Sequence, residues 1–269
     1  MNLLFPQWQG AGNLLALRQS AEHLALERPD ASWYSLELDV GTPTEVENGI
    51  QAYRQLKTQL ETITEFLKAK RPDTLFTLGE DCSIELAPIS YLNNRHNNLT
   101  VVWFDAHTDL QVPETSPSGD LHGMPLRLLL GDGNRALKQL LPTFLRPEQV
   151  VLAGVRMLDL SEERFVSQQR LRRLSAAQLN EDPKLIVQTL RSAGAQQVYL
   201  HVDFDVVDPE EFSSLGWPVP GGMTVAALEQ ALEILHQEIT VVGGGSTEYL
   251  PKRSEDKRTA RHVLDAWLP

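Results

Sequence analysis

Residues 99–109 read LTVVWFDAHTD, and this stretch predicts the fold of the chain. A run that is apolar on both faces, such as residues 99–104, is typical of an interior strand of a parallel sheet. Residues 198–209, VYLHVDFDVVDP, repeat the form, with an apolar run followed at once by acidic residues. Ligands bind beyond the carboxyl ends of the strands in such sheets. The two stretches therefore predict a functional site at that edge.

The spacing of the acidic residues indicates a metal site. Side chains at i, i+2 and i+4 of an extended chain point to one side, so Asp105, His107 and Asp109 can converge, and so can Asp203 and Asp205. Carboxylates this close raise one another's pKa unless a cation compensates them. The alternative is that they are solvated loop residues or helix N-caps. Two such segments behind two buried strands favour the metal site.

Apolar runs alternate with helix-period segments along the chain, which predicts a parallel sheet covered by helices on both faces. We expect helices at residues 44–70, 84–91 and the C-terminus, and strands at 75–78, 99–104, 150–154, 198–202 and 239–242. The last strand is expected to end at a Gly243-Gly244-Gly245 turn, and residues 110–121 are expected to form a loop. Without a linker or a repeat, one domain over 1–269 is the economical interpretation.

Composition argues against nucleic-acid binding, disulfide bonding and membrane association. The formal charge of −12 argues against a nucleic-acid partner, because phosphate binding needs clustered Lys and Arg. The single cysteine, Cys82, excludes an intrachain disulfide and fits a reducing compartment. No run approaches about 18 apolar residues and the N-terminus lacks leader features, so we expect a cytoplasmic protein with no membrane partner.

Five motifs in order resemble the arginase/agmatinase (ureohydrolase) family, and their loop is more similar to the arginase branch. They are GEDCS (79–83), DAHTD (105–109), HGMP (122–125), DFDVVDP (203–209) and Glu248. The resemblance implies a three-layer α/β/α sandwich with a mainly parallel central sheet. It also implies two Mn²⁺ ions that hydrolyse a guanidino or amidine carbon, for which carboxylates and imidazole are suitable ligands.

The family pattern also implies roles for single residues. Asp105 and Asp203 would be bridging ligands that bind both ions. Asp109 and Cys82 would complete the coordination of the first ion. His107 and Asp205 would complete the coordination of the second. His122, Asp109 and Glu248 are the expected catalytic residues, with His122 as a proton shuttle to the leaving amine. Gln111, Ser118 and Asp120 are expected to bind substrate together with Glu248, whose carboxylate suits a planar guanidinium. The remaining histidines, His201 among them, have no partners visible in the sequence.

Several positions depart from the family pattern. Cys82 stands where the family usually has histidine, and a thiolate there favours Zn²⁺ or Fe²⁺ over Mn²⁺. The other interpretation of Cys82 is a small buried hydrophobic residue. Glu80 stands where glycine is usual, and the sequence offers no reason. Gln111 and Asp120 replace asparagines of arginases, which affects substrate selectivity.

The first hypothesis is an enzyme that cleaves a linear C–N bond of an arginine-like guanidino compound, releasing urea or a substituted urea and an amine. Agmatine, formiminoglutamate, a guanidino acid and a modified arginine remain open as substrates. A second hypothesis is a ligand-binding or regulatory protein of the same fold with an incomplete metal site. A zinc deacetylase of related architecture is a weaker third. Members of the family are often trimers or hexamers, so a homo-oligomer is expected.

Overall fold

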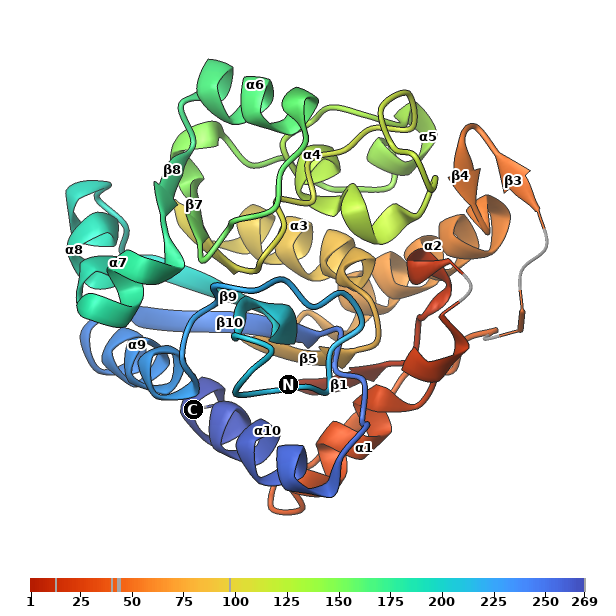
Figure 1. Cartoon of the computed structure of the whole chain (residues 1–269). Coiled ribbons are helices and arrows are strands. Elements are labelled where there is room, and N and C mark those ends of the chain that lie inside the picture. The colour runs from red at the N-terminus through yellow and green to blue at the C-terminus, as the bar shows by residue number, and fades with distance from the viewer. Residues whose placement is uncertain (13, 40, 43–44, 97, 269) are drawn as a thin grey trace.

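An eight-stranded sheet forms the centre of the molecule (Figure 1). The computed structural model describes residues 1–12, 14–39, 41–42, 45–96 and 98–268. The strand order is β2-β1-β5-β10-β9-β6-β7-β8, and every pairing in this sheet is parallel. The strands are β1 Asn2–Phe5, β2 Tyr34–Ser35, β5 Leu75–Gly79, β6 Leu99–Phe104, β7 Val150–Ala153, β8 Arg172–Leu174, β9 Gln197–Asp203 and β10 Thr240–Thr247.

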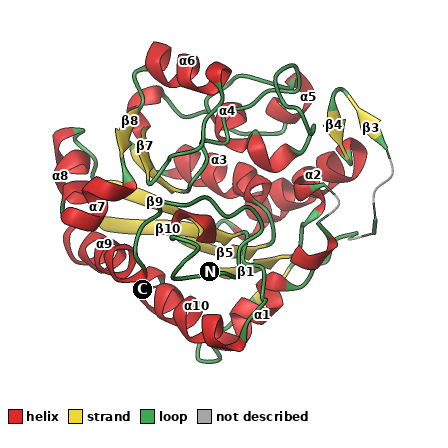
Figure 2. Cartoon of the chain, viewed as in Figure 1, coloured by secondary structure: helices red, strands yellow, loops and turns green. Residues whose placement is uncertain are grey.

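Helices cover both faces of this sheet (Figure 2). One face carries α2 Tyr53–Lys70, α3 Leu86–Arg95, α4 Pro125–Leu129, α5 Arg135–Lys138 and α6 Leu160–Gln169. The other carries α1 Ser20–Glu27, α7 Ala176–Glu181, α8 Leu185–Ser192, α9 Val225–Glu238 and α10 Ser254–Trp267. Each side has its own apolar core against the sheet. The predicted three-layer α/β/α sandwich with a mainly parallel sheet is confirmed.

Alternation along the strands decides which layer receives the polar residues. In β9, Val198, Leu200 and Val202 pack into the core on the α9 and α10 side. Tyr199 packs into the opposite core, beneath α2 and α3. Because side chains two residues apart share a face, His201 and Asp203 point to the same side as Tyr199. The layer that contains α2, α3 and α4 therefore receives these polar side chains.

The helix predicted at residues 44–70 begins later than expected. Thr44 lies outside the described residues, and α2 begins at Tyr53 after an antiparallel hairpin of β3 Val46–Glu47 and β4 Ile50–Gln51. Asn48 and Gly49, with φ of 55° and 71°, make the two-residue turn that an Asn-Gly pair favours. Ile50 is nevertheless fully buried, as its place in the apolar stripe predicted.

The predicted glycine turn at residues 243–245 is wrong, because β10 runs straight through it to Thr247. Neighbouring groups approach the backbone there too closely for a side chain. A β-carbon at Gly244 would lie 2.6 Å from Nε1 of Trp267, and one at Gly245 would overlap the Glu85 carboxylate. These glycines permit close packing inside a strand, a role that sequence alone does not separate from a turn.

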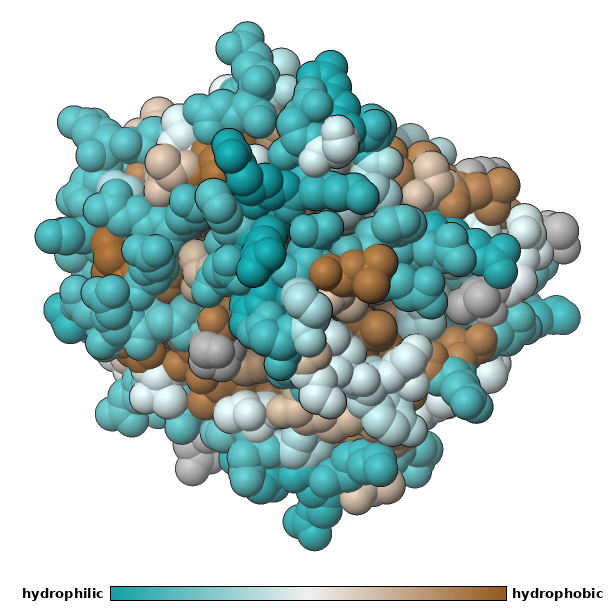
Figure 3. All heavy atoms as spheres, turned by 90° about the horizontal axis from the view of Figure 1, so that it is seen from below, coloured by the Kyte–Doolittle hydropathy of each residue, from teal (hydrophilic) through white to brown (hydrophobic). Residues whose placement is uncertain are grey.

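The other predicted elements are found with small shifts in their ends. The predicted helix at residues 84–91 is a 3₁₀ turn, η3 Cys82–Glu85, followed by α3. Residues 110–120 form neither helix nor strand, as predicted for the loop, and a second 3₁₀ turn, η4, covers Leu121–Gly123. The surface seen in Figure 3 is mostly hydrophilic, with hydrophobic residues in small patches. No helix of the described residues has the length and apolarity needed to cross a bilayer.

Candidate metal centre

Four neighbouring strands at the middle of the sheet deliver the candidate ligands to one edge. Cys82 follows β5, Glu248 follows β10, Asp203 ends β9 and Asp105 follows β6. These strands are adjacent in the order β5-β10-β9-β6, although β5 and β6 come early in the chain and the other two late. The carboxyl ends of parallel strands meet at one edge, so the topology assembles the cluster.

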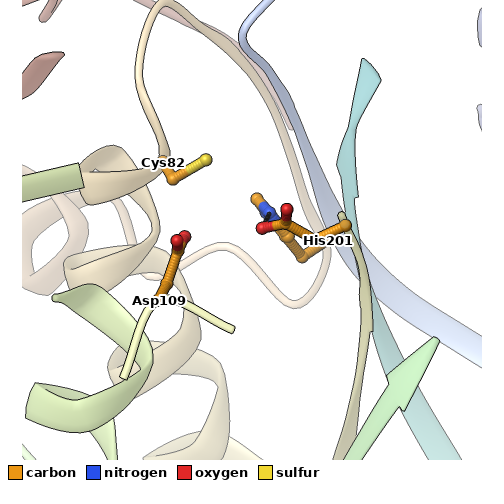
Figure 4. Close-up of side chains that lie close together, drawn as sticks. Cys82, Asp109 and His201 are labelled. Carbon is orange, nitrogen blue, oxygen red and sulfur yellow. Dashed lines mark ion pairs between the residues drawn. The ribbon is translucent and has the colours of Figure 1, made fainter. Parts of the chain in front are cut away.

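Among the described residues, potential ligand atoms fall into three groups, and the atoms within each lie within 4.8 Å of one another. The groups are Cys82, Asp105, Asp109 and His201; Asp105, His107 and Asp205; and Cys82, Asp203 and Glu248. Asp105 and Cys82 each belong to two groups, and a carboxylate placed in this way can be shared by two ions. Asp203 lies instead with Cys82 and Glu248. Figure 4 shows Cys82, Asp109 and His201 pointing into one space.

Hydrogen bonds hold these carboxylates in place. Asp105 accepts bonds from the His107 backbone N–H at 2.6 Å and from Nε1 of Trp103 at 2.9 Å. Asp203 accepts from the backbone N–H of Asp205 at 2.7 Å and from the Cys82 thiol at 3.1 Å. The first contact of each pair is the i to i+2 turn that the aspartate spacing creates. The ligand geometry is thus set by the backbone at the strand ends.

The charges of the centre are poorly compensated by protein groups. Burial, reinforced by neighbouring carboxylates, raises the pKa of Asp109, Asp203 and Asp205 above the ordinary range. Burial opposes the charge of His107, yet its contacts with Asp105 and Asp205 raise its pKa to about 11. The Cys82 thiol also has a raised pKa, caused first by burial and then by Asp203. Protons therefore stay on this cluster unless a cation displaces them.

Among the buried polar atoms that lack a hydrogen-bond partner in the described chain, three belong to this cluster. They are Oδ2 of Asp109, Oε2 of Glu248 and Nε2 of His201. Asp109 and Glu248 also have positive φ values, 53° and 61°, which are uncommon for non-glycine residues. Buried oxygen and nitrogen atoms without hydrogen-bond partners can serve as metal ligands. Together with the sulfur of Cys82 they form a set of ligand atoms that fits divalent ions.

A cavity of about 340 Å³ opens directly onto the cluster. Its wall includes Gln111, Ser118, His122 and Glu248, four of the residues predicted to bind substrate or to catalyse. Nδ1 of His122 lies 3.1 Å from Oε1 of Glu248, and its ring packs on Trp217 at 4.5 Å between centroids.

Asp120 is the exception among the predicted substrate-binding residues. It is not among the described residues of the cavity wall, and a β-carbon added at Gly12 would lie 2.5 Å from its carboxylate. The structure therefore brings Gln111 and Ser118, but not Asp120, to the cavity.

Glu80, which the sequence left unexplained, caps a helix. Its carboxylate accepts bonds from the backbone N–H groups of Gln19, Ser20 and Ala21, at 3.2, 2.8 and 3.4 Å, and from the Ser20 hydroxyl. Ser20 is the first residue of α1, where a negative charge is favourable. Glu80 thus ties α1 to the segment that carries Cys82.

Sequence reasoning missed His201, its neighbour Glu85, and Trp217, which lies in the cavity wall and packs on His122. A signal for His201 was present, since it precedes Asp203 by two residues in one strand and must share its face. Glu85 carried no such signal, because its partners His201 and Tyr199 are more than 100 residues away. Trp217 lies in a segment without regular structure, so no periodicity placed it in the cavity.

Comparison with known proteins supports the architecture described above. Residues 15–268 match the profile of the Arginase family. An arginase of Staphylococcus aureus (strain MRSA252) is 34% identical over 225 residues, which is 81% of this chain and 74% of that protein.

Solved arginase structures have the same fold. The native structure of the Bacillus caldovelox arginase superposes with a TM-score of 0.84 at 25% identity, covering 99% of this chain and 96% of that one. The Entamoeba histolytica arginase, solved in complex with L-ornithine, gives a TM-score of 0.89 at 21% identity and covers 99% and 97%. The chain belongs to the arginase family.

Proposed function

We propose that this chain uses two divalent ions to hydrolyse a linear C–N bond of an arginine-like guanidino compound, releasing urea or a substituted urea and an amine. One observation carries the proposal: Asp105 is common to two groups of ligand atoms beside a cavity lined by Glu248, which has an unpartnered carboxylate oxygen. The names of the relatives described above support an arginine-like substrate.

Glu248 is the residue we assign to the substrate cation. Its Oε1 is held by the Cys82 backbone N–H at 3.3 Å and by His122, whereas Oε2 is free to accept from a ligand. A carboxylate accepts guanidinium N–H groups in matched planar geometry. A cavity of about 340 Å³ suits a small molecule, and Gln111 and Ser118 line its wall for contact with the rest of the substrate.

The protein contributes positioning and proton transfer to the reaction. When bound, two divalent ions supply Lewis acidity and lower the pKa of a coordinated water to near neutrality. The side chains that would hold these ions include the carboxylates of Asp105, Asp109 and Asp203. Burial opposes the charge of His122, but the contact with Glu248 raises its pKa, so it can carry a proton to the leaving amine.

The ligand sets suggest different ions at the two positions. Asp105, His107 and Asp205 offer oxygens and one imidazole, which suit Mn²⁺. Cys82 adds a sulfur donor to the other position, which favours Zn²⁺ or Fe²⁺ there. We propose two ions, with Mn²⁺ at least at the position of His107.

Product release from a panel of guanidino compounds tests the function. The protein is stripped with a chelator, reconstituted with Mn²⁺, Zn²⁺ or Fe²⁺, and assayed for urea and ammonia with arginine, agmatine, guanidino acids and Nω-modified arginines. We expect urea or a substituted urea from at least one compound, loss of activity after chelation and recovery with metal. The alternative, a ligand-binding protein with an incomplete site, predicts binding without product.

Two further properties are proposed from the sequence. The chain is expected to form a homo-oligomer, which light scattering coupled to gel filtration measures. A cytoplasmic location is expected from the single cysteine, and fractionation of the source cells tests it.

A further inference from the structure

His201 lies beneath the metal centre on β9, where it is fully buried. Its Nδ1 is 2.9 Å from Oε1 of Glu85, which is also fully buried. The other carboxylate oxygen of Glu85 accepts a bond from the Tyr199 hydroxyl at 2.5 Å. Because an ionised carboxylate can only accept, Nδ1 of His201 is the donor in this contact.

The ring of His201 is fixed from its face as well as from its edge. It stacks on Trp103 with 3.7 Å between centroids and an interplanar angle of 24°. Trp103 in turn donates from Nε1 to Asp105. These contacts leave the imidazole little freedom and direct Nε2 toward the cluster (Figure 4).

Nε2 of His201 has no hydrogen-bond partner among the described residues. The nearest carboxylate oxygen, Oδ2 of Asp105, is 3.8 Å away, which is beyond hydrogen-bond distance. However, Nε2 lies within 4.8 Å of ligand atoms of Cys82, Asp105 and Asp109. With the proton on Nδ1, the lone pair of Nε2 lies near one sulfur and two carboxylates and accepts no hydrogen bond from the described residues.

We propose that His201 binds, through Nε2, the ion that is also held by Cys82 and Asp109, with Asp105 as the shared carboxylate. The inference rests on the proposed binuclear site and deepens it. Each ion then receives one imidazole, from His107 or from His201. A sulfur, a nitrogen and two oxygens form a ligand set suited to tetrahedral Zn²⁺. Glu85, which contacts Nδ1, is then the carboxylate that orients the metal-bound histidine.

The competing interpretation is that His201 is a structural imidazolium that joins Glu85 to Asp105. That interpretation predicts a close contact with a carboxylate at both ring nitrogens, and both contacts are within ion-pair distance. Only the contact at Nδ1 is short enough for a hydrogen bond, since the Nε2 distance is 3.8 Å. The geometry therefore favours a ligand over a buried ion pair.

Zn²⁺ binding by equilibrium dialysis tests the assignment. The wild-type protein should bind two ions per chain. His201→Gln, which keeps a polar side chain of similar size, should weaken one of them by about 100-fold or more and leave the other unchanged. Glu85→Gln should weaken the same ion by about 10- to 100-fold. His107→Gln is the matched control, because it removes an imidazole from the other ion.

Two ions bound to His201→Gln with wild-type affinity would overturn the inference while leaving the proposed function intact. A wild-type protein that binds no ion overturns both. Crystals of the Zn²⁺-loaded wild-type protein give a test that needs no variant. Anomalous density should place an ion about 2.1 Å from Nε2. An ion on Cys82 and Asp109 with Nε2 more than about 3 Å away rejects His201 as a ligand.

Discussion

Replacing Glu248 by Gln tests the binding of the substrate cation. The side chain is 2% exposed, and its Oε1 is occupied by the backbone of Cys82 and by His122. Oε2 is buried and has no partner in the described chain, and the Glu248 side chain lines the cavity. Gln keeps the shape of the side chain but removes its charge, and an amide nitrogen at the Oε2 position cannot accept from a guanidinium.

The expected loss follows from that single contact. A hydrogen bond to a charged group contributes about 1.5–3 kcal/mol, and about 1.4 kcal/mol corresponds to a factor of ten. We therefore expect kcat/KM of Glu248→Gln to fall about 10- to 150-fold. The bound metal should stay at the wild-type level, because the proposed partner of Oε2 is the substrate.

The assay is urea release with the best substrate of the panel, with metal content measured on the same samples. Glu162→Gln is the matched control. It removes a buried negative charge from the same cavity wall, but its oxygens are already bonded to the Thr108 hydroxyl at 2.6 Å and the Asp159 N–H at 2.9 Å. The control should lose less activity than Glu248→Gln. Wild-type kcat/KM in Glu248→Gln refutes the assignment, and loss of an ion would make Glu248 a metal ligand beside Cys82 and Asp203.

Three further variants test other parts of the site. Asp203→Ala should lose metal at both positions if Asp203 bridges the ions, and unchanged stoichiometry in elemental analysis removes it from the bridge. Cys82→His should raise Mn²⁺-dependent activity relative to Zn²⁺, because nitrogen replaces a soft sulfur donor, and an unaltered metal preference means that the sulfur is not a ligand. Glu80→Gln tests the pH dependence of stability. Burial raises the pKa of Glu80 from 4.5 to about 7, so the folded wild type binds more protons than the unfolded chain between these pH values. The free energy of unfolding of the wild type therefore falls as the pH rises through this window. Relative to Glu80→Gln, urea unfolding should show a loss of about 3 kcal/mol between pH 4.5 and pH 7.5, and a constant difference contradicts the shifted pKa.

The strands and the candidate carboxylate ligands could be predicted from the sequence because local rules determine their positions. The apolar run of residues 99–104 is a central strand, and the two-residue spacing puts Asp105 and His107 in one ligand group. Asp203 lies at the same edge of the sheet because β9 and β6 are adjacent parallel strands, and the sequence predicted a parallel sheet but not this strand order.

The remaining features depend on contacts between distant segments. Glu80 is explained only when α1, about 60 residues earlier, lies against it. Gly245 had the sequence features of a turn, and only the position of Glu85 shows why a glycine stands in the strand. The Asn48-Gly49 hairpin differs, since its signal was local and was overridden by the helical periodicity around it.

The central claim is that two ions in this cluster carry out guanidino hydrolysis, and a metal titration tests it most directly. Apo protein receives increasing Mn²⁺ or Zn²⁺, and bound ions per chain and urea release are measured on the same samples. We predict that activity rises as the second ion binds. Full activity with one ion or fewer contradicts the binuclear account, and two bound ions without product from any guanidino compound contradicts the proposed reaction.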